Sequence, residues 1–557
     1  MQTEQNEKFS KKPPVTPSSI GNYLLDKLHE KGVRHIFGIP GDYILKFNKL
    51  IEEHPHIEFI GTTRENTAGH MADAYARMQG LGVACITYGV GISIVNSTAQ
   101  AYVESVPTIV ISGAASDSEF RRSRRLHHLI NTSVTGERDT TQLEIFKNIT
   151  IGQTILDDPE TAAEEIDRII DLCLEMKKPV YIELPRDMIE APIANHPAIF
   201  HNIHMGKSHL FEKEIQKILH ASRQPVIWIG HEISRFHLSD SVLAFAEKFH
   251  IPIVSSLLGK TTVSEHHPLF LGVYNGELSS AHLLDYLKDT DCIFILGVIL
   301  SDIETGIFTA KIDQTHQIIA SKAEISIDKK SHHNYCFEEF IAGLQHIPCD
   351  APFRNPAKFV REKVSFLPER EKKITSPRTF TCIESHLQPG NIVVTDIGDS
   401  LFGASNFVLD KNCFIACPYY ASIGFSIPAA IAVQLAKPAQ RVVCIVGDGA
   451  FQITCTELST AIRYGISPIL ILLNNHGYGT ERPILDGTYN DVGNWDYTAL
   501  TKVFKGGVGY KITTEQELDE ALTKAFSDPQ QLYLIEVELG QTDFSIGLQR
   551  FMQLVTG

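Results

Sequence analysis

The sequence predicts an α/β fold of three domains, each a mainly parallel sheet flanked by helices. The length of 557 residues suggests about three domains of ordinary size. Short apolar runs such as PTIVISG and CIFILGV alternate with longer amphipathic stretches. Because strands that are buried on both faces read as continuous apolar runs, this alternation is typical of parallel sheets covered by helices.

The same alternation predicts the domain boundaries. We expect the first domain at residues 18–192, beginning with an amphipathic helix near Ile20 and containing the strands HIFGI, GVACITY, PTIVISG and PVYIEL. A stretch containing proline and histidine leads to the second domain, residues 205–356, with the strands PVIWIG, IPIVSS and CIFILGV. The third domain is expected at residues 372–557, with the strands NIVVTDIG, RVVCIVGDG, PILILLNN and QLYLIEVEL.

The composition narrows the classes of partner. There are 50 Lys and Arg against 66 Asp and Glu, a formal net charge of −16, which disfavours nucleic acid and anionic membranes. No apolar run reaches the roughly 18 residues of a membrane span, and the polar start of the chain is unlike a secretion signal. The ten cysteines include no CxxC pair. We therefore expect a cytoplasmic protein that acts on a small molecule.

Two strand ends in the third domain carry residue types that suit a metal ion. The run RVVCIV ends on Gly447, Asp448 and Gly449, and the next apolar run, PILILL, ends on Asn474 and Asn475. The carboxyl ends of parallel strands share one crevice, and Mg²⁺ prefers oxygen ligands that leave room for phosphate oxygens. A glycine and a helix N-terminus after the aspartate would suit a diphosphate. An isolated Asp-Gly pair would instead indicate a tight turn.

The paired GDG and NN motifs resemble the diphosphate motif of thiamine-diphosphate enzymes. The run TTRENTAGHMADAYAR resembles the segment in which that family places the acid that engages the pyrimidine ring of the cofactor, and this acid corresponds to Glu65. Without the resemblance, Glu65 reads equally well as a helix-start carboxylate favoured by the helix dipole. The likeness runs from about residue 18 to residue 557. It implies a pyrimidine-binding first domain, a Rossmann-like middle domain, a diphosphate-binding third domain, and thiamine diphosphate with Mg²⁺ as cofactors.

Three further segments resemble 2-oxo acid decarboxylases of the pyruvate, indolepyruvate and phenylpyruvate type. They are HIFGIPGDYIL with Asp42, the double histidine His127 and His128, and HGYGTERPILDG with Glu481. The resemblance implies that these residues transfer protons, which histidine can do near neutral pH. Taken alone, Asp42 would be a helix N-cap, the histidines incidental loop residues, and Glu481 a surface glutamate.

The resemblance also implies the residues that hold the cofactor. In YYASIGFSIPAA, the side chain of Ile423 would wedge the cofactor into a bent shape, and the carbonyl of Ala421 would accept from its amino group. Many relatives have glycine at the alanine position and threonine at the position of Ile397. The complete implied sets are Asp399, Ser400, Ala421, Ile423, Gly449, Ala450 and Thr480 for the cofactor, and Asp448, Asn475 and Gly477 for the metal.

The substrate is predicted from the bulk of the expected pocket, which the resemblance places at Leu401, Ile484 and Ile303. Bacterial pyruvate decarboxylase has a tryptophan where this chain has Leu401, so we expect a wider pocket that accepts an aromatic or branched 2-oxo acid such as phenylpyruvate or indolepyruvate. The alternatives are pyruvate itself, or carboligation of the acetohydroxyacid synthase type, against which the histidine pair argues. The expected reaction gives an aldehyde and CO₂, in a homodimer that pairs into a homotetramer.

Overall fold

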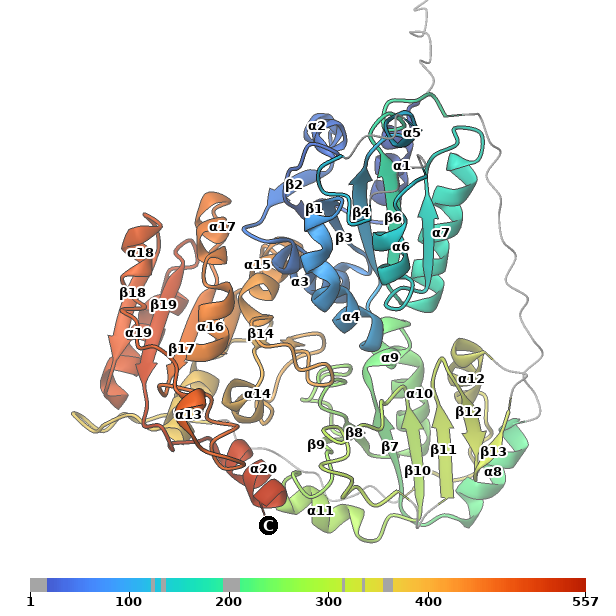
Figure 1. Ribbon diagram of the computed structural model, residues 1–557. Coiled ribbons are helices and arrows are strands. Elements are labelled where there is room, and N and C mark those ends of the chain that lie inside the picture. The colour runs from blue at the N-terminus through green and yellow to red at the C-terminus, as the bar shows by residue number, and fades with distance from the viewer. Residues whose placement is uncertain are drawn as a thin grey trace, which may run out of the picture.

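The computed structural model describes residues 18–121, 126–131, 137–193, 211–312, 316–332, 336–353 and 364–556, and in these residues it contains three sheets of six, seven and six strands. Each sheet is mainly parallel and flanked by helices, so the predicted fold class is confirmed (Figure 1). The predicted boundaries at residues 205, 356 and 557 lie outside the described residues. The domain boundaries therefore stay predictions.

The N-terminal sheet has the strand order β2-β1-β3-β4-β6-β5, and all of its pairs are parallel. Its central strands β3, β4 and β6 are buried along their whole length, which explains their continuous apolar sequences. The elements are α1 (Ile20–Glu30), β1 (His35–Gly38), α2 (Leu45–Glu53), β2 (Glu58–Gly61), α3 (Glu65–Gln79), β3 (Gly82–Thr87), η1 (Val90–Ile94), α4 (Val95–Val103), β4 (Thr108–Ala114), α5 (Asp117–Arg121), α6 (Thr141–Phe146), β5 (Gly152–Ile155), α7 (Ala162–Met176) and β6 (Val180–Pro185).

The middle sheet has the order β13-β12-β11-β10-β7-β8-β9 and is antiparallel only at the β11, β12 and β13 edge. Its core lies around the buried strands β7 and β10. The elements are α8 (Phe211–Ala221), β7 (Pro225–Ile229), α9 (His231–Arg235), α10 (Ser239–Phe249), β8 (Ile253–Ser255), β9 (Phe270–Val273), α11 (Ala281–Leu287), β10 (Cys292–Leu296), β11 (His316–Ala320), β12 (Ile325–Ile327), β13 (Lys330–Ser331) and α12 (Phe337–Leu344).

The C-terminal sheet has the order β15-β14-β16-β17-β19-β18 and is parallel throughout. Strands β16 and β17 are parallel neighbours. The motifs that follow them therefore lie side by side at the carboxyl-terminal end of the sheet. The elements are α13 (Ser376–His386), β14 (Ile392–Thr395), α14 (Asp399–Ala404), β15 (Phe414–Ile415), α15 (Ser426–Ala436), β16 (Val442–Gly447), α16 (Asp448–Thr454), α17 (Glu457–Arg463), β17 (Ile469–Asn474), η2 (Thr488–Asn490), α18 (Leu500–Val503), β18 (Val508–Ile512), α19 (Glu515–Ser527), β19 (Tyr533–Glu538) and α20 (Ile546–Thr556).

The N-terminal and C-terminal domains meet where α3 packs along α15, near the centre of the molecule (Figure 1). The largest apolar core includes residues of both domains, and Gln79 at the end of α3 donates to the carbonyl oxygen of Ala436 at 2.6 Å. The two domains are therefore packed as one body around α3. None of the helices that the structure describes is long and apolar enough to cross a membrane.

Candidate active site

The ends of β16 and β17 are joined through one carboxylate. Asp448, the first residue of α16, is buried and accepts the backbone N–H of Gly449 at 2.7 Å and that of Gly477 at 3.0 Å. Burial raises the pKa of Asp448 to about 6, and these backbone donors oppose the rise. A divalent cation at this carboxylate would favour its ionised form, so the residue fits the predicted metal site.

The two asparagines after PILILL have different surroundings. Asn474 is buried at the end of β17 and donates its amide to Glu536 Oε1 on the neighbouring strand at 2.8 Å. Asn475 lies beyond the strand and is only partly buried, with its amide nitrogen beside Gly479. Asn474 is therefore engaged within the sheet, and the metal-ligand role of Asn475 stays a prediction.

The backbone beside the same strand end is open at Gly447 and closely packed at Gly449. A Cβ built at Gly447 would meet no atom within 4 Å, whereas one built at Gly449 would lie 2.4 Å from the ring of Tyr478. Ala450 follows in the first turn of α16 and is buried. An open backbone next to a carboxylate and backbone N–H donors fits a phosphate group with its metal ion.

The loop after β14 is tied to two other parts of the C-terminal domain. Both oxygens of Asp399 bind within the protein, accepting the hydroxyl of Ser376 at 2.6 Å and the backbone N–H of Ser545 at 3.0 and 3.2 Å. Burial raises the pKa of Asp399. Ser400 is buried and donates to the carbonyl oxygen of Ile397. The Asp399 side chain is thus occupied in holding α14 against α13 and the segment before α20.

Thr480 and Gly398 bring the β17 and β14 loops together. Gly398 has φ +85°, and a Cβ there would lie 3.0 Å from the hydroxyl oxygen of Thr480. Further along, Ala421 has φ +57°, a left-handed conformation that suits glycine better than alanine. Ile423 follows with its side chain 38% exposed. These residues lie in the domain that carries Asp448, as predicted, although the backbone at Ala421 is strained.

Asp42, His127 and His128 lie together in the N-terminal domain. His127 Nε2 is 3.0 Å and His128 Nε2 3.8 Å from the carboxylate of Asp42. The hydroxyl of Tyr43 donates to the carbonyl oxygen of His127 at 2.8 Å, and the two rings stack. The helix that follows begins at Leu45 with Ile44 as its N-cap, so the reading of Asp42 as an N-cap is wrong.

The two predicted catalytic glutamates lie in different domains. Glu65 is the first residue of α3 and accepts the hydroxyl of Ser93 at 2.8 Å. Glu481 is exposed, and its backbone N–H binds the carbonyl oxygen of Tyr478. In the part of the chain that the structure describes, no hydrogen bond or ion pair connects Glu481 with Asp42 or the histidines.

Two of the three predicted substrate-pocket residues pack in apolar clusters, and the third is exposed. Leu401 is buried in the large core, and Ile303 packs against the same core and against an apolar cluster that includes Phe402 and Leu548 of α20. Ile484 is 53% exposed and belongs to none of the apolar clusters of the described residues. In the described residues, the three side chains are therefore not gathered into one apolar cluster.

Two arginines near the site were missed by the sequence analysis. Arg186 Nη1 lies 3.7 Å from Asp42, and no local pattern indicates this contact. Arg482 binds Asp486 at 2.9 Å and Asp491 at 2.6 Å, beside Glu481. The first of these pairs has i,i+4 spacing, which is a recognisable sequence signal.

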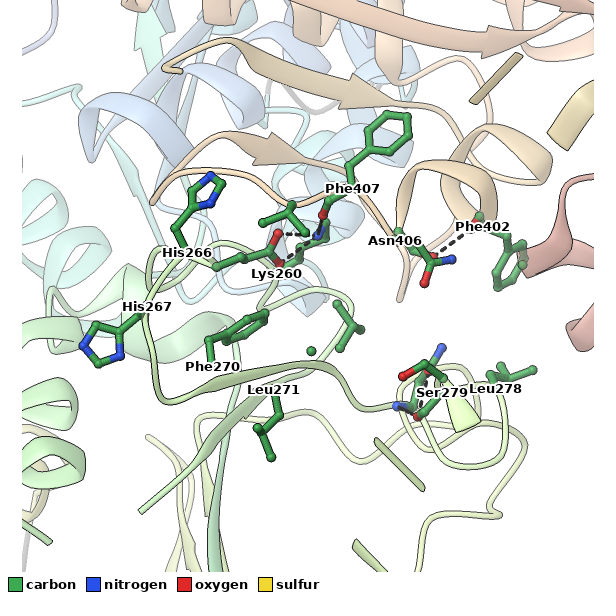
Figure 2. Close-up of a pocket in the computed structure, with 18 of the residues that line it drawn as sticks. Lys260, His266, His267, Phe270, Leu271, Leu278, Ser279, Phe402, Asn406 and Phe407 are labelled. Atoms are coloured by element: carbon green, nitrogen blue, oxygen red, sulfur yellow. Dashed lines mark hydrogen bonds and ion pairs between the residues drawn. The ribbon is translucent and has the colours of Figure 1, made fainter. Parts of the chain in front are cut away.

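A cavity of about 490 Å³ lies between the middle and C-terminal domains (Figure 2). Phe270, Leu278 and Phe402 line it, and at one side Lys260 binds Glu265 and the carbonyl oxygen of Phe407, each at 2.7 Å. Its lining contains none of the residues predicted to bind cofactor, metal or substrate. Two of its lining residues, Leu278 and Phe402, belong to the apolar cluster against which Ile303 packs.

Family models of the thiamine pyrophosphate (TPP) enzymes match three parts of this chain. The N-terminal TPP binding domain matches residues 18–141, the central domain matches residues 213–336, and the C-terminal TPP binding domain matches residues 396–537. Each matched range lies within one of the three sheet-containing parts of the structure.

Two relatives match this chain over almost its whole length. An alpha-keto-acid decarboxylase of Mycobacterium tuberculosis H37Rv is 32% identical over 535 residues, 94% of this chain and 94% of that protein. An indole-3-pyruvate decarboxylase of Azospirillum brasilense is 32% identical over 550 residues, 96% and 98% of the two chains. The solved Rhodococcus jostii RHA1 thiamine diphosphate-dependent 4-hydroxybenzoylformate decarboxylase has the same fold, with a TM-score of 0.75, 19% identity, and coverage of 94% and 99%. The chain therefore belongs to the family of thiamine-diphosphate-dependent 2-oxo acid decarboxylases.

Proposed function

We propose that this protein decarboxylates an aromatic or branched 2-oxo acid to an aldehyde and CO₂, using thiamine diphosphate and Mg²⁺. The observation that carries the proposal is the group formed by Asp42, His127 and His128, because a non-oxidative decarboxylation must deliver a proton to the product carbon. Family membership supports the reaction class.

The C-terminal domain would hold the cofactors. Asp448, Asn475 and the Gly477 carbonyl are the proposed Mg²⁺ ligands, and the diphosphate would lie beside the open backbone of Gly447. When bound, thiamine diphosphate supplies a thiazolium ring that accepts the electron pair released as CO₂ leaves. Ile423, whose aliphatic side chain is 38% exposed, would bend the cofactor from the same domain.

The titratable residues would move protons in different places. Glu65, held by Ser93 at the start of α3, would bind the pyrimidine ring nitrogen of the cofactor. The Asp42 carboxylate, 3.0 Å from His127 Nε2, would keep the imidazole oriented toward the reacting carbon. Glu481 would supply the second proton-transfer group from the C-terminal domain.

The proposed substrate class depends on side-chain volume. By the resemblance, Leu401 would stand where bacterial pyruvate decarboxylase narrows its pocket with tryptophan, and the smaller side chain would leave room for a ring or branched chain. One relative is an indole-3-pyruvate decarboxylase, and the bulky aromatic substrate in its name supports a pocket of this size. The alternative substrate is pyruvate.

A homodimer is proposed as the minimal active unit, with pairing into a tetramer. Glu481 and the Asp42 group have no contact in the described part of one chain, so a second chain could bring them together. Large apolar side chains near the site, Ile423, Tyr478, Ile484 and Trp495, are also exposed in the single chain. Such surfaces are typical of protein interfaces. All ten cysteines are unpaired, which suits a reducing compartment such as the cytoplasm.

The test is a panel of 2-oxo acids ranked by kcat/KM in an aldehyde-coupled assay, with and without Mg²⁺ and thiamine diphosphate. We expect phenylpyruvate or indolepyruvate to rank above pyruvate, and turnover to require both cofactors. A higher kcat/KM for pyruvate would refute the substrate class. Full activity of Glu65→Gln at saturating cofactor would refute the role of Glu65, and sedimentation of an active monomer would refute the dimer.

A further inference from the structure

The segment before Ile423 is held by a buried carboxylate of the N-terminal domain. Glu104, which caps the C-terminus of α4, is fully buried. Its Oε1 accepts the backbone N–H groups of Tyr419 and Tyr420, each at 3.0 Å. Hydrogen bonds to an ionised acceptor are stronger than neutral ones, so these bonds fix the backbone just ahead of Ala421.

Glu104 and its two backbone donors form the first anchor of this segment, and Arg77 adds further hydrogen bonds to it. Arg77 donates to Glu104 Oε2 at 2.7 Å, to Asp73 Oδ1 at 2.5 Å, and to the carbonyl oxygen of Ala416 at 2.8 Å. All three side chains are almost completely buried. Since a buried carboxylate is costly unless it is paired and fully hydrogen-bonded, this network is a specific arrangement rather than a chance surface contact.

A second buried carboxylate holds the other side of Ile423. Asp396, directly after β14, accepts the backbone N–H of Gly424 at 3.1 Å and that of Ser426 at 2.9 Å. Its Oδ1 also accepts the N–H of Ile397 at 3.0 Å. The segment is thus fixed at the start of α15 by a residue of its own domain.

Between these two carboxylate anchors, hydrogen bonds rather than side-chain packing determine the conformation of the chain. Ala421 is in the left-handed region, and the hydroxyl of Ser422 accepts from Asn96 of the N-terminal domain at 2.8 Å. Ile423 itself is 38% exposed and belongs to no apolar cluster of the described residues. Side-chain packing therefore does little to fix Ile423, and the hydrogen bonds on either side must do so.

We propose that Glu104 and Asp396 are positioning residues that hold Ile423 against the cofactor. They act through the backbone at residues 419–420 and 424–426 and touch no reacting atom themselves. The inference rests on the proposed function, in which Ile423 is the wedge that bends the cofactor. One anchor comes from each domain, so the wedge position depends on the contact between α3, α4 and the C-terminal domain.

The experiment is a double-mutant cycle on the holoenzyme with Mg²⁺ and thiamine diphosphate. Glu104→Gln keeps the shape and one acceptor but removes the charge, Asp396→Asn does the same at the second anchor, and Ile423→Ala removes the wedge. The readout is the rate of hydrogen–deuterium exchange at C2 of the bound cofactor, measured by NMR after acid quench without substrate. Cofactor occupancy is measured in the same samples.

We expect each anchor variant to slow the exchange about tenfold, the effect of losing one charge-assisted hydrogen bond. In the Ile423→Ala background the same substitutions should change it less than about twofold, because the residue through which they act is gone. The matched control is Glu304→Gln, which alters another buried glutamate that accepts two successive backbone N–H groups, at Leu257 and Leu258. It should leave the exchange unchanged.

Several results would overturn the proposal. Additive effects of Glu104→Gln and Ile423→Ala would mean that the anchor does not act through the wedge. Normal exchange in both anchor variants, with Ile423→Ala still slow, would refute the positioning role alone. Normal exchange in Ile423→Ala would instead refute the wedge itself, which belongs to the proposed function. If one anchor variant fails to fold by circular dichroism, the other anchor decides the outcome.

Discussion

Arg482 holds together the segment that follows β17. Gly477 and Asp491 form a β-bridge at the base of this segment. Inside it, the guanidinium of Arg482 donates to Asp486 at 2.9 Å, to Asp491 at 2.6 Å, and weakly to the carbonyl oxygen of His476 at 3.4 Å. Replacing Arg482 by methionine keeps most of the stem and removes all three bonds.

The size of the effect follows from the exposure of the partners. Asp486 and Asp491 are 62% and 51% exposed, so water can solvate them once Arg482 is gone, and each ion pair stabilises by about 0.2–1 kcal/mol. With the weak bond to the carbonyl, the total is about 1–2 kcal/mol for the closed segment. That corresponds to roughly a five- to thirtyfold rise in the population of opened segments.

The segment carries Glu481 and begins at Gly477, so its opening should weaken both catalysis and metal binding. We expect Arg482→Met to speed amide hydrogen exchange in this segment by roughly five- to thirtyfold, and through the smaller closed population to lower kcat/KM and raise the Mg²⁺ concentration needed for half-maximal holoenzyme formation. Arg168→Met removes a partly exposed ion pair with Glu165 in the N-terminal domain and serves as the control. If amide exchange in this segment of Arg482→Met stayed within about twofold of wild type, the population argument would be refuted.

Three other substitutions test separate features. Ala421→Gly relieves a residue at φ +57° and should raise the free energy of unfolding by about 0.5–1 kcal/mol, seen as a higher urea midpoint; a lower midpoint would contradict the strain. Burial raises the pKa of Glu304 to about 7, so the folded state binds this proton more tightly than the unfolded chain. The free energy of unfolding therefore falls as the pH rises from about 4.3 to about 7, and Glu304→Gln should make the urea midpoint depend less on pH in this range. An unchanged dependence of the midpoint on pH would contradict this role of Glu304. Gly449→Ala places a Cβ 2.4 Å from the ring of Tyr478 and should weaken thiamine diphosphate binding about tenfold by calorimetry; unchanged affinity would show that the ring can move aside.

The central strands could be predicted because burial on both faces leaves an unbroken apolar sequence. Strands β3, β4 and β17 are examples in which every residue is buried. The edge strands β5, β13 and β18 were not predicted, and each is largely exposed or only partly buried. An edge strand lacks the continuous apolar signal, and its pairing depends on a neighbour that local sequence does not identify.

The site divides in a similar way. Residues that are adjacent in the sequence, such as Asp448 with Gly449 or His127 with His128, could be recognised because one short pattern contains them. The alternation of side chains does not say which of two successive asparagines faces a ligand, and the structure separates them because Asn474 binds Glu536. Contacts such as Arg186 with Asp42 bring distant segments together, and no local pattern contains both residues.

Helix α3 carries both a residue that a short sequence pattern identifies and a long-range contact that no local pattern contains. Its first residue is Glu65, and three turns further on Arg77 binds Glu104 and the Ala416 carbonyl of the other domain. The helix also packs along α15, which begins directly after the segment that carries Ile423. One rigid element therefore bears both the acid proposed for the pyrimidine ring and the anchor proposed for the wedge. A shift of α3 would move both together, so the geometry of the N-terminal acid and that of the C-terminal wedge are mechanically linked within each chain.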